Sequence, residues 1–313
     1  MKLPRLVLTL LLASAPWAEV RADEPLAAVV KSDSLSLYAN AVAAFRAEFK
    51  GEIVEYDLRD SSERAERIFA RLADDKPNLV LALGPLAANA ARKHLSDVPV
   101  VFALVPNYEK YGLEGKNVTG IALTRPSAAQ LQTLKLLVPR AIRIGVVYTP
   151  RFSHSVVADA AAAARGAGVT LVQAKVEGPE EVPGAVRGIA ERIDALWMIA
   201  DRSVANVEAV KGLISLGLEQ KLPVFALTDS QVKEGALVAL SPNYASIGQQ
   251  AGRLANRIAF EKVDPGALAV TMPEGLDIAI NLSTAKRIGV ECDLALEIFK
   301  FAAKNGYPIR VYE

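Results

Sequence analysis

One pattern of apolar runs and helix-like segments occurs twice along this chain. The first copy, residues 76–104, ends in Val-Phe-Ala-Leu, and the second copy, residues 193–227, has the same order and ends in the same four residues. Apolar runs that alternate with helices are typical of parallel βαβ units. The pattern predicts an α/β chain of two similar lobes, each with a doubly wound parallel sheet. The alternative is a chance likeness, because few residue types fill buried strands.

Each lobe is expected to contain at least four strands. They are 26–31, 53–58, 79–83 and 100–104 in the first lobe and 144–148, 170–175, 195–200 and 224–227 in the second. In parallel sheets, the loops at the carboxyl ends of the strands carry the functional groups. Two such lobes facing a central cleft can close by a hinge motion, and a ligand that contacts both lobes stabilises the closed state.

The composition excludes several classes of function. The chain has 313 residues, which agrees with two folded units, and its 36 Lys and Arg balance 35 Asp and Glu, so no nucleic acid partner is expected. Two His and one Cys rule out a disulfide within the chain and a multi-Cys metal site. We expect no metal and no cofactor, and we interpret Cys292 as a small core residue.

The amino terminus has the pattern of an export signal. Lys2 and Arg5 precede an apolar run at 6–13, and Val-Arg-Ala at 20–22 suits a signal peptidase. The run is shorter than the ~20 residues that cross a bilayer. We predict that residues 1–22 are removed and that the protein is periplasmic, with an uncleaved anchor as the alternative. No Cys lies near the expected cleavage point, so the sequence does not predict lipid attachment.

Candidate ligand-binding residues in the first lobe follow its predicted strands. The polar residues 32–34 precede a helix expected at 35–49, where they either cap the helix or lie beside an amino terminus that holds a ligand anion. A Gly-Pro step after 79–83 permits close backbone approach, and the free amides that follow it suit a carboxylate. The candidates in this lobe are Ser32, Asp33, Ser34, Gly84, Pro85, Leu86 and Asn107.

Candidates from the second half of the chain include two acidic residues at strand ends. Asp201 and Asp229 either accept hydrogen bonds from a ligand amine or cap the next helix. Arg151 has the planar guanidinium that suits a carboxylate, with a solvated surface position as the alternative. Tyr148 and Tyr244 either pack on an apolar ligand or belong to the core and the hinge.

Catalytic motifs in the sequence are weak. Ser230 and Ser283 each precede a lysine by three residues, but a serine that caps a helix gives the same spacing, and the S-D-N and K-T-G companions are absent. The motifs of zinc proteases, P-loops and dinucleotide-binding folds are absent as well. We predict that the chain is not an enzyme, and an exported serine hydrolase is the alternative.

Four segments resemble the substrate-binding proteins of a group of ABC transporters that includes aromatic amino acid binders. They are 101–121 with its Val-Thr-Gly motif, 222–240, 244–252 with its paired glutamines, and 280–286. The resemblance covers nearly the whole chain after residue 22. Amino acid binders of this group tend to have an Asp shortly after Val-Thr-Gly, which this chain lacks, so the ligand class stays open.

This resemblance implies a type I periplasmic-binding fold whose two lobes are joined by three crossings. One lobe comprises 24–122 and 244–262, and the other comprises 123–243 and 263–313. The ligand residues that it carries over by position are Ser32, Ser34, Gly84, Pro85, Asp201 and Asp229.

It also implies an exported protein, expected to be a monomer, that captures a small organic ligand. An amino acid or a small carboxylate is the implied ligand, and a membrane permease is the implied partner. The alternative is an extracytoplasmic sensing module coupled to a membrane receptor or kinase.

Overall fold

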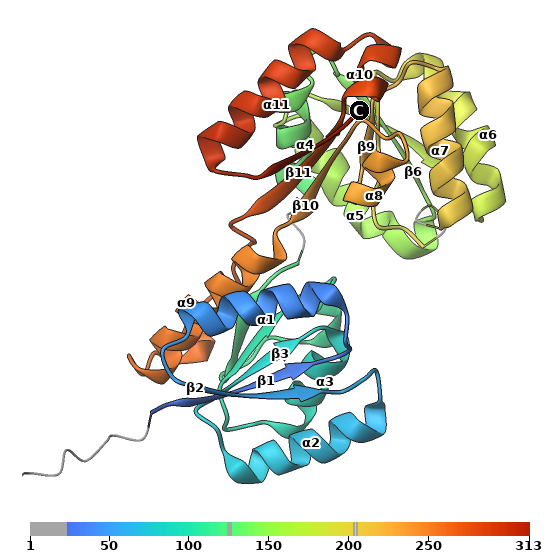
Figure 1. Ribbon diagram of the computed structural model, residues 1–313. Helices are drawn as coiled ribbons and strands as arrows, with labels where there is room; N and C mark the ends of the chain where they lie inside the picture. The colour runs from blue at the N-terminus through green and yellow to red at the C-terminus, as the bar shows by residue number, and fades with distance from the viewer. Residues whose placement is uncertain (1–23, 124–126, 203, 205) are drawn as a thin grey trace, which may run out of the picture.

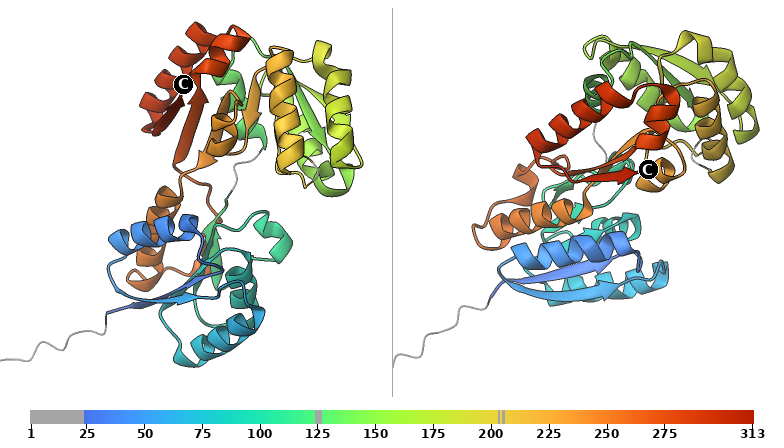
Figure 2. Two further views of the ribbon diagram at one scale, coloured as in Figure 1. Left: turned by 45° about the vertical axis from the view of Figure 1, so that its right-hand side comes forward. Right: turned by 45° about the horizontal axis from the view of Figure 1, so that its top comes forward.

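Two lobes make up the computed structural model (Figure 1), which describes residues 24–123, 127–202, 204 and 206–313, without the side chains of 291–295. Figure 2 shows the lobes joined at a narrow waist and standing apart elsewhere. The expected signal segment 1–22 and the side chain of Cys292 lie outside the described residues.

Lobe one is a five-stranded parallel sheet with helices on both faces, in the strand order β2-β1-β3-β4-β5. Its strands are β1 (Leu26–Lys31), β2 (Glu52–Asp57), β3 (Leu79–Leu83), β4 (Val100–Ala103) and β5 (Val118–Ile121). Its helices are α1 (Ser36–Glu48), α2 (Ser62–Asp75), α3 (Pro85–His94) and α9 (Tyr244–Ala259), with 3-10 turns η1 (Tyr108–Tyr111) and η4 (Pro265–Ala267).

The core of lobe one has a layer on each face of this sheet. The central strand β3 is buried at every position, whereas the edge strand β2 is half exposed. Helices α1 and α9 cover the layer that contains Phe45 and Ile247, and α2 and α3 cover the layer that contains Phe69. Helix α9 approaches α1 closely because a Cβ atom at Gly248 would lie 2.1 Å from the carbonyl oxygen of Ala41, so no larger residue fits there.

Lobe two is a seven-stranded sheet in the order β12-β11-β10-β9-β8-β6-β7, with β10 and β11 antiparallel and all other neighbours parallel. Its strands are β6 (Arg143–Tyr148), β7 (Thr170–Lys175), β8 (Ala195–Trp197), β9 (Val224–Ala226), β10 (Val238–Pro242), β11 (Leu276–Asn281) and β12 (Ile309–Tyr312). Its helices are α4 (Ser127–Leu137), α5 (Pro150–Ala164), α6 (Val182–Ile189), α7 (Val207–Glu219), α8 (Asp229–Lys233), α10 (Leu282–Ile288) and α11 (Glu291–Asn305), with 3-10 turns η2 (Pro179–Glu181) and η3 (Ala190–Arg192).

The two faces of the second sheet bury separate apolar layers. Helices α4, α5, α10 and α11 pack on the layer that contains Trp197 and Phe225, whereas α6, α7 and α8 pack on the layer that contains Leu196 and Val224. Because successive residues of a strand point to opposite faces, β8 and β9 each supply both layers.

Three segments cross between the lobes, after β5, after β10 and before β11. They are held side by side: the amide of Ala122 donates to the carbonyl of Thr271 at 2.9 Å, and the amide of Asn243 donates to the carbonyl of Gly275 at 3.0 Å. The sequence-based division gave all of 263–313 to lobe two, and the structure corrects its start. The amide of Gly266 donates to the carbonyl of Lys116 at 2.9 Å, so the chain leaves lobe one only beyond Thr271.

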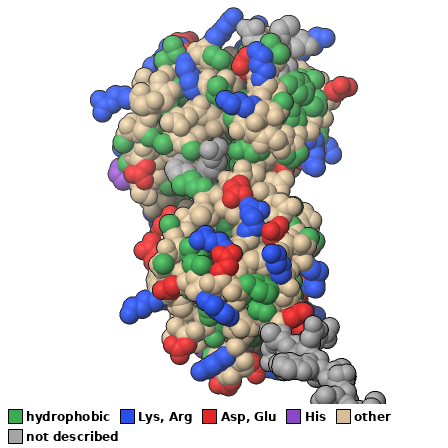
Figure 3. All heavy atoms as spheres, turned by 90° about the vertical axis from the view of Figure 1, so that its left-hand side faces the viewer, with side chains coloured by type: hydrophobic (Ala, Val, Ile, Leu, Met, Phe, Trp, Pro, Cys, Tyr) green, Lys and Arg blue, Asp and Glu red, His purple; other side chains and the backbone are tan. Residues whose placement is uncertain are grey.

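All eight strands expected from the sequence are present in the structure, with ends that differ by at most three residues. On the face drawn in Figure 3, acidic and basic side chains are interspersed over lobe one, as the balanced charge predicts. Among the described residues, no helix has the length and the apolar character that a membrane span requires.

Candidate functional site

The carboxyl ends of β1 and β3 meet at Ser32. Ser32 is 4% exposed. Its hydroxyl donates to the carbonyl oxygen of Leu83 at 2.9 Å and accepts from the amide of Ala87 at 3.0 Å. The sequence predicted that the amides after Pro85 would be free for a ligand carboxylate. One of them, the amide of Ala87, donates to Ser32 instead. Leu86 lies in the first turn of α3, where N–H groups have no acceptor within the helix.

Gly84 makes this close arrangement possible. Its φ of +89° lies outside the range that L-residues favour, and a Cβ atom there would lie 2.2 Å from the hydroxyl of Tyr38 and 2.7 Å from that of Ser32. Pro85 follows at the first position of α3, as predicted. Burial, and then the nearby charge of Asp33, raises the pKa of the Tyr38 hydroxyl, which therefore stays protonated near neutral pH.

The predicted cap of α1 is wrong. Helix α1 begins at Ser36 after an extended Leu35, and no side chain caps it. Asp33 instead accepts the amide of Ser34 at 2.6 Å, and the Ser34 hydroxyl donates to Asp57 at 2.7 Å. These polar groups hold the loop after β1 against the end of β2 and leave the amino terminus of α1 without a side-chain cap.

The loop after β4 has two residues in the left-handed conformation. Leu104 has φ +59° although it is buried, and Asn107 has φ +49° and is exposed. Asparagine tolerates this conformation, whereas a buried leucine there is a strained exception. Tyr108, the first residue of η1 after Asn107, packs on Phe102 with 5.2 Å between the ring centroids.

In lobe two, the ends of β6 and β8 are joined through a buried carboxylate. Asp201 is 1% exposed, and its Oδ2 accepts the amide of Thr149 at 3.1 Å. Thr149 is equally buried, and its Oγ1 has no hydrogen-bond partner among the residues that the structure describes. An unpaired buried hydroxyl is unfavourable. At this edge of lobe two, one buried hydrogen-bonding group therefore lacks a partner while the lobes stand apart.

Two arginines flank one aromatic ring beside that carboxylate. The guanidinium carbons of Arg151 and Arg202 lie 5.4 Å and 5.8 Å from the ring centroid of Phe152. Both arginine side chains are exposed, and no carboxylate of the described residues pairs with either of them. The sequence predicted Arg151, whereas Phe152 and Arg202 were not candidates, although they adjoin the candidates Arg151 and Asp201.

Three other candidates have structural partners. Tyr148 is 1% exposed and donates to Gln173 at 3.0 Å, so it belongs to the core. Asp229 accepts hydrogen bonds from Arg310 and Tyr312, each at 2.7 Å, and these bonds link β12 to α8. Tyr244 begins α9 at the hinge and packs against the lobe-one core; burial, and then Asp277, raises its pKa.

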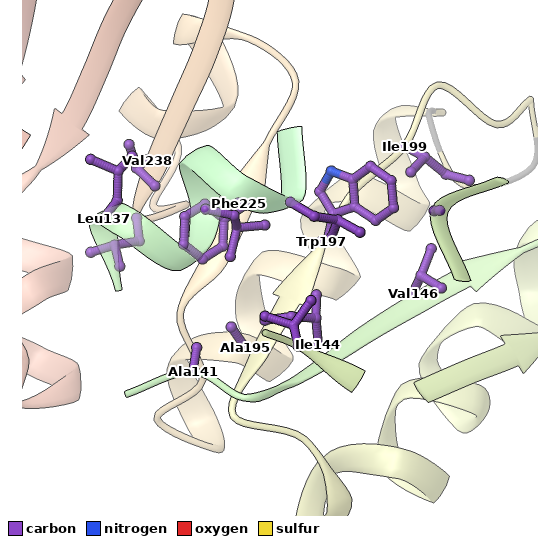
Figure 4. Packing of buried hydrophobic residues seen from close by; sticks show 14 of the residues in the cluster. Leu137, Ala141, Ile144, Val146, Ala195, Trp197, Ile199, Phe225 and Val238 are labelled. Carbon is purple, nitrogen blue, oxygen red and sulfur yellow. The ribbon is translucent and has the colours of Figure 1, made fainter. Parts of the chain in front are cut away.

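An apolar pocket of about 130 Å³ lies on one face of lobe two and was not predicted from the sequence. Trp197 and Phe225, which are neighbours on β8 and β9 (Figure 4), form part of its wall. Leu134 of α4 lines the pocket as well. Pro242, at the end of β10, closes it toward the hinge. These side chains come from strands that the sequence places correctly, but only the fold shows that space remains between them.

The two S-x-x-K serines do not cap their helices. Thr228 caps α8 with a capping box, and Asn281 caps α10. The Ser230 hydroxyl lies 3.0 Å from that of Thr228, and no described residue activates it as a base would. Within the described residues, no group of three or more His, Cys, Asp or Glu side chains is placed to bind a metal ion.

Comparisons with known proteins agree with this architecture. The family model described as ABC transporter substrate binding protein matches residues 29–304. The tyrosine-binding protein of Clostridioides difficile (strain R20291) is 26% identical over 266 residues, which are 82% of this chain and 74% of that protein.

Solved structures are similar in fold. A ligand-free, open substrate-binding protein with adhesive properties from Clostridium difficile has a TM-score of 0.76 and 21% identity over 93% of this chain and 100% of that one. An ABC domain from Streptococcus pneumonia in complex with L-Trp has a TM-score of 0.59 and 20% identity over 88% of this chain and 98% of that one.

Proposed function

Because this chain belongs to the ABC transporter substrate-binding protein family, we propose that it captures a small organic ligand between its lobes and delivers it to a membrane permease. The family is one of ligand-binding proteins and not of enzymes. The observation that carries the proposal is the pair of lobes joined by three crossings and otherwise apart. Such a joint permits hinge closure, and a ligand that contacts both lobes favours the closed state.

The polar groups at the strand ends favour a ligand with a carboxylate. On lobe two, Arg151 and Arg202 present two guanidinium groups that have no carboxylate partner among the described residues. Guanidinium groups bind carboxylates with two parallel hydrogen bonds. On lobe one, Leu86 supplies an amide in the first turn of α3. A compact ligand placed between these groups would contact both lobes, as closure requires.

The ligand class that we propose is an amino acid or a similar small carboxylate. One relative is named as a tyrosine-binding protein, and one structure of the same fold holds L-Trp. Asp201 is buried next to Arg202 and accepts the amide of Thr149, and because a carboxylate can accept several hydrogen bonds, we propose the ligand amine as a further donor to it. An amine and a carboxylate on one ligand would thus both find partners on lobe two.

The test is a binding screen combined with a measurement of shape. Thermal shift with the twenty amino acids and a set of small dicarboxylates should give at least one saturable increase in Tm. Small-angle X-ray scattering with that ligand should show a smaller radius of gyration than without it. If neither class binds, mass spectrometry of the natively purified protein identifies any other solute, and an empty protein in every assay would contradict the proposal.

We also propose export and the absence of catalysis, each with its own test. Amino-terminal sequencing of the secreted protein should begin after residue 22. Double substitution Ser230→Ala and Ser283→Ala should leave ligand binding unchanged, and a serine-directed probe should not label the unmodified protein.

A further inference from the structure

The apolar pocket of lobe two lies where the two hinge strands leave the sheet. Trp197 and Phe225 line it from neighbouring strands, and Leu134 lines it from α4. Pro242 and Leu276, at the hinge ends of β10 and β11, complete the wall. An occupant would therefore touch the segments that bend when the lobes close.

The size of this pocket selects a compact group. Its volume of about 130 Å³ is close to the roughly 150 Å³ of an apolar protein cavity that holds benzene. The side chains that line it include no charged residue. Because an unpaired charge is very costly in apolar surroundings, the pocket suits an uncharged ring and excludes a charged side chain.

Trp197 adds a hydrogen-bond donor to this surface, which also includes the polar residues Gln130 and Thr133. The residue is 4% exposed, and no described residue accepts a hydrogen bond from its indole N–H. The indole N–H is a hydrogen-bond donor only. An occupant with an acceptor oxygen within reach would accept a hydrogen bond from it, whereas a hydrocarbon ring would not.

We propose that this pocket binds an uncharged, single-ring portion of the ligand that carries a hydroxyl or another acceptor for the indole N–H of Trp197. The proposal rests on the proposed function, because it assigns part of the transported ligand to lobe two. In this proposal, the pocket beside α4 selects the ligand by the size of its ring and by its acceptor group. The arginines at the strand ends bind the carboxylate.

Phenol and toluene test the pocket without requiring the natural ligand. In the full chain with Trp17→Phe, Trp197 is the only tryptophan, so its fluorescence and its indole ¹⁵N–¹H signal each report one site. Both compounds should saturate a change in Trp197 fluorescence. Phenol should move the indole N–H signal downfield, and toluene should move it less, because only phenol supplies an oxygen acceptor.

A matched pair of leucine substitutions locates the effect. Leu240→Phe enlarges a half-buried residue of the pocket wall and should weaken phenol binding at least 10-fold. Leu171→Phe makes the same change in a half-buried residue on β7, at the other end of the sheet, and should leave phenol binding within 2-fold. If Leu240→Phe does not fold, a second measurement replaces this test. Nuclear Overhauser contacts from phenol to Trp197 and Leu134 are then measured in the chain that keeps Leu240.

The outcomes separate this inference from the proposed function. Phenol that binds without saturation, equally well to both variants, or without contacts to Trp197 would overturn the pocket assignment. If amino acids bind but Leu240→Phe leaves the relative affinities for L-Tyr, L-Phe and L-Ala unchanged, the proposed function holds and the pocket assignment fails. If phenol binds as expected and no amino acid or carboxylate does, the ligand class proposed above fails and the pocket remains.

Discussion

The two lobes share one plan and differ in what they add to it. The first five strands of each lobe have the same order, β2-β1-β3-β4-β5 in lobe one and β7-β6-β8-β9-β10 in lobe two, and in each lobe the fifth strand leads into a crossing. Lobe two adds β11 and β12, of which β11 enters antiparallel from the third crossing. The repeated pattern in the sequence thus corresponds to a repeated fold with one extended edge.

At the carboxyl ends of their strands, the lobes differ in a second way. In lobe one, Ser32 both donates and accepts, and Gly84 brings the backbone close to Tyr38. In lobe two, Thr149 has a buried hydroxyl without a partner, and Arg151 has no carboxylate partner among the described residues. The buried hydroxyl of lobe one is therefore hydrogen-bonded within the fold, whereas that of lobe two is a group that a ligand or closure can still satisfy.

Gly84→Ala should give the largest effect, since it disrupts the close packing of Gly84 against Tyr38 and Ser32 in lobe one. The added Cβ atom would lie 2.2 Å from the Tyr38 hydroxyl, and φ +89° is unfavourable for alanine, so we expect a loss of about 2–4 kcal/mol in the free energy of unfolding. Chemical denaturation measures it. Gly184→Ala, in α6 with open space around its Cβ position, is the control and should be neutral or stabilising. Equal stability of the two variants would show that the edge of lobe one is not closely packed.

Removal of both arginines tests the groups that lobe two leaves available. Arg151→Gln with Arg202→Gln should weaken binding of a carboxylate ligand by about 10- to 100-fold, because charge-assisted hydrogen bonds contribute roughly 1.5–3 kcal/mol. Calorimetric titration measures the affinity, and denaturation should show little change in stability. Arg165→Gln, at the other end of α5, is the matched control. An unchanged affinity in the double variant would assign the ligand carboxylate to lobe one.

Two buried hydroxyls offer a direct comparison between the lobes. Ser32→Ala should cost about 1–3 kcal/mol because it leaves the Ala87 amide without its acceptor. Thr149→Val keeps the shape and removes a hydroxyl that has no partner, so it should raise the free energy of unfolding by up to about 1 kcal/mol.

Thr149→Ser, which keeps a hydroxyl, is the control for that substitution. Urea denaturation of the three variants gives the sign for each lobe. A destabilising Thr149→Val would mean that its hydroxyl has a partner in solution, and the contrast between the lobes would then be lost.

The sequence predicted the sheets better than the site. Buried parallel strands are continuous apolar runs, so β1 and β3 have the expected bounds. The roles of polar residues were harder to predict, because a strand-end carboxylate has many possible partners: Asp229 pairs with Arg310 and Tyr312, 81 and 83 residues away. The pocket beside Trp197 could not be predicted, since a cavity depends on how α4 packs and not on residue type.

One aspartate in each lobe has a pKa that hydrogen bonds lower. Burial alone would raise both pKa values, but hydrogen bonds outweigh it. Those from Ser34 and from the amide of Arg59 lower the pKa of Asp57. Those from the side chain and amide of Arg143 and from the amide of Ile142 lower the pKa of Asp194.

A carboxyl group whose pKa is lower in the folded chain contributes stability when it is ionised. That contribution is complete above its pKa in the unfolded chain, about 3.9, and is lost as the pH falls through the lower folded value. Asp194 accepts four hydrogen bonds, from the amides of Ile142 and Arg143 and twice from the Arg143 guanidinium. Asp57 accepts two and lies 3.8 Å from the Lys31 ammonium.

We therefore expect Asp194→Asn to cost about 1–2 kcal/mol at pH 7 and Asp57→Asn about half as much, since each neutral amide gives weaker hydrogen bonds than the carboxylate it replaces. Both deficits should shrink as the pH falls below about 4, where the aspartates of the unmodified chain become protonated. Denaturation at pH 7 and at several values between 2 and 4 measures this. A deficit that persists unchanged to pH 2 would show that the asparagine disturbs packing and that the charge of the aspartate does not stabilise that lobe.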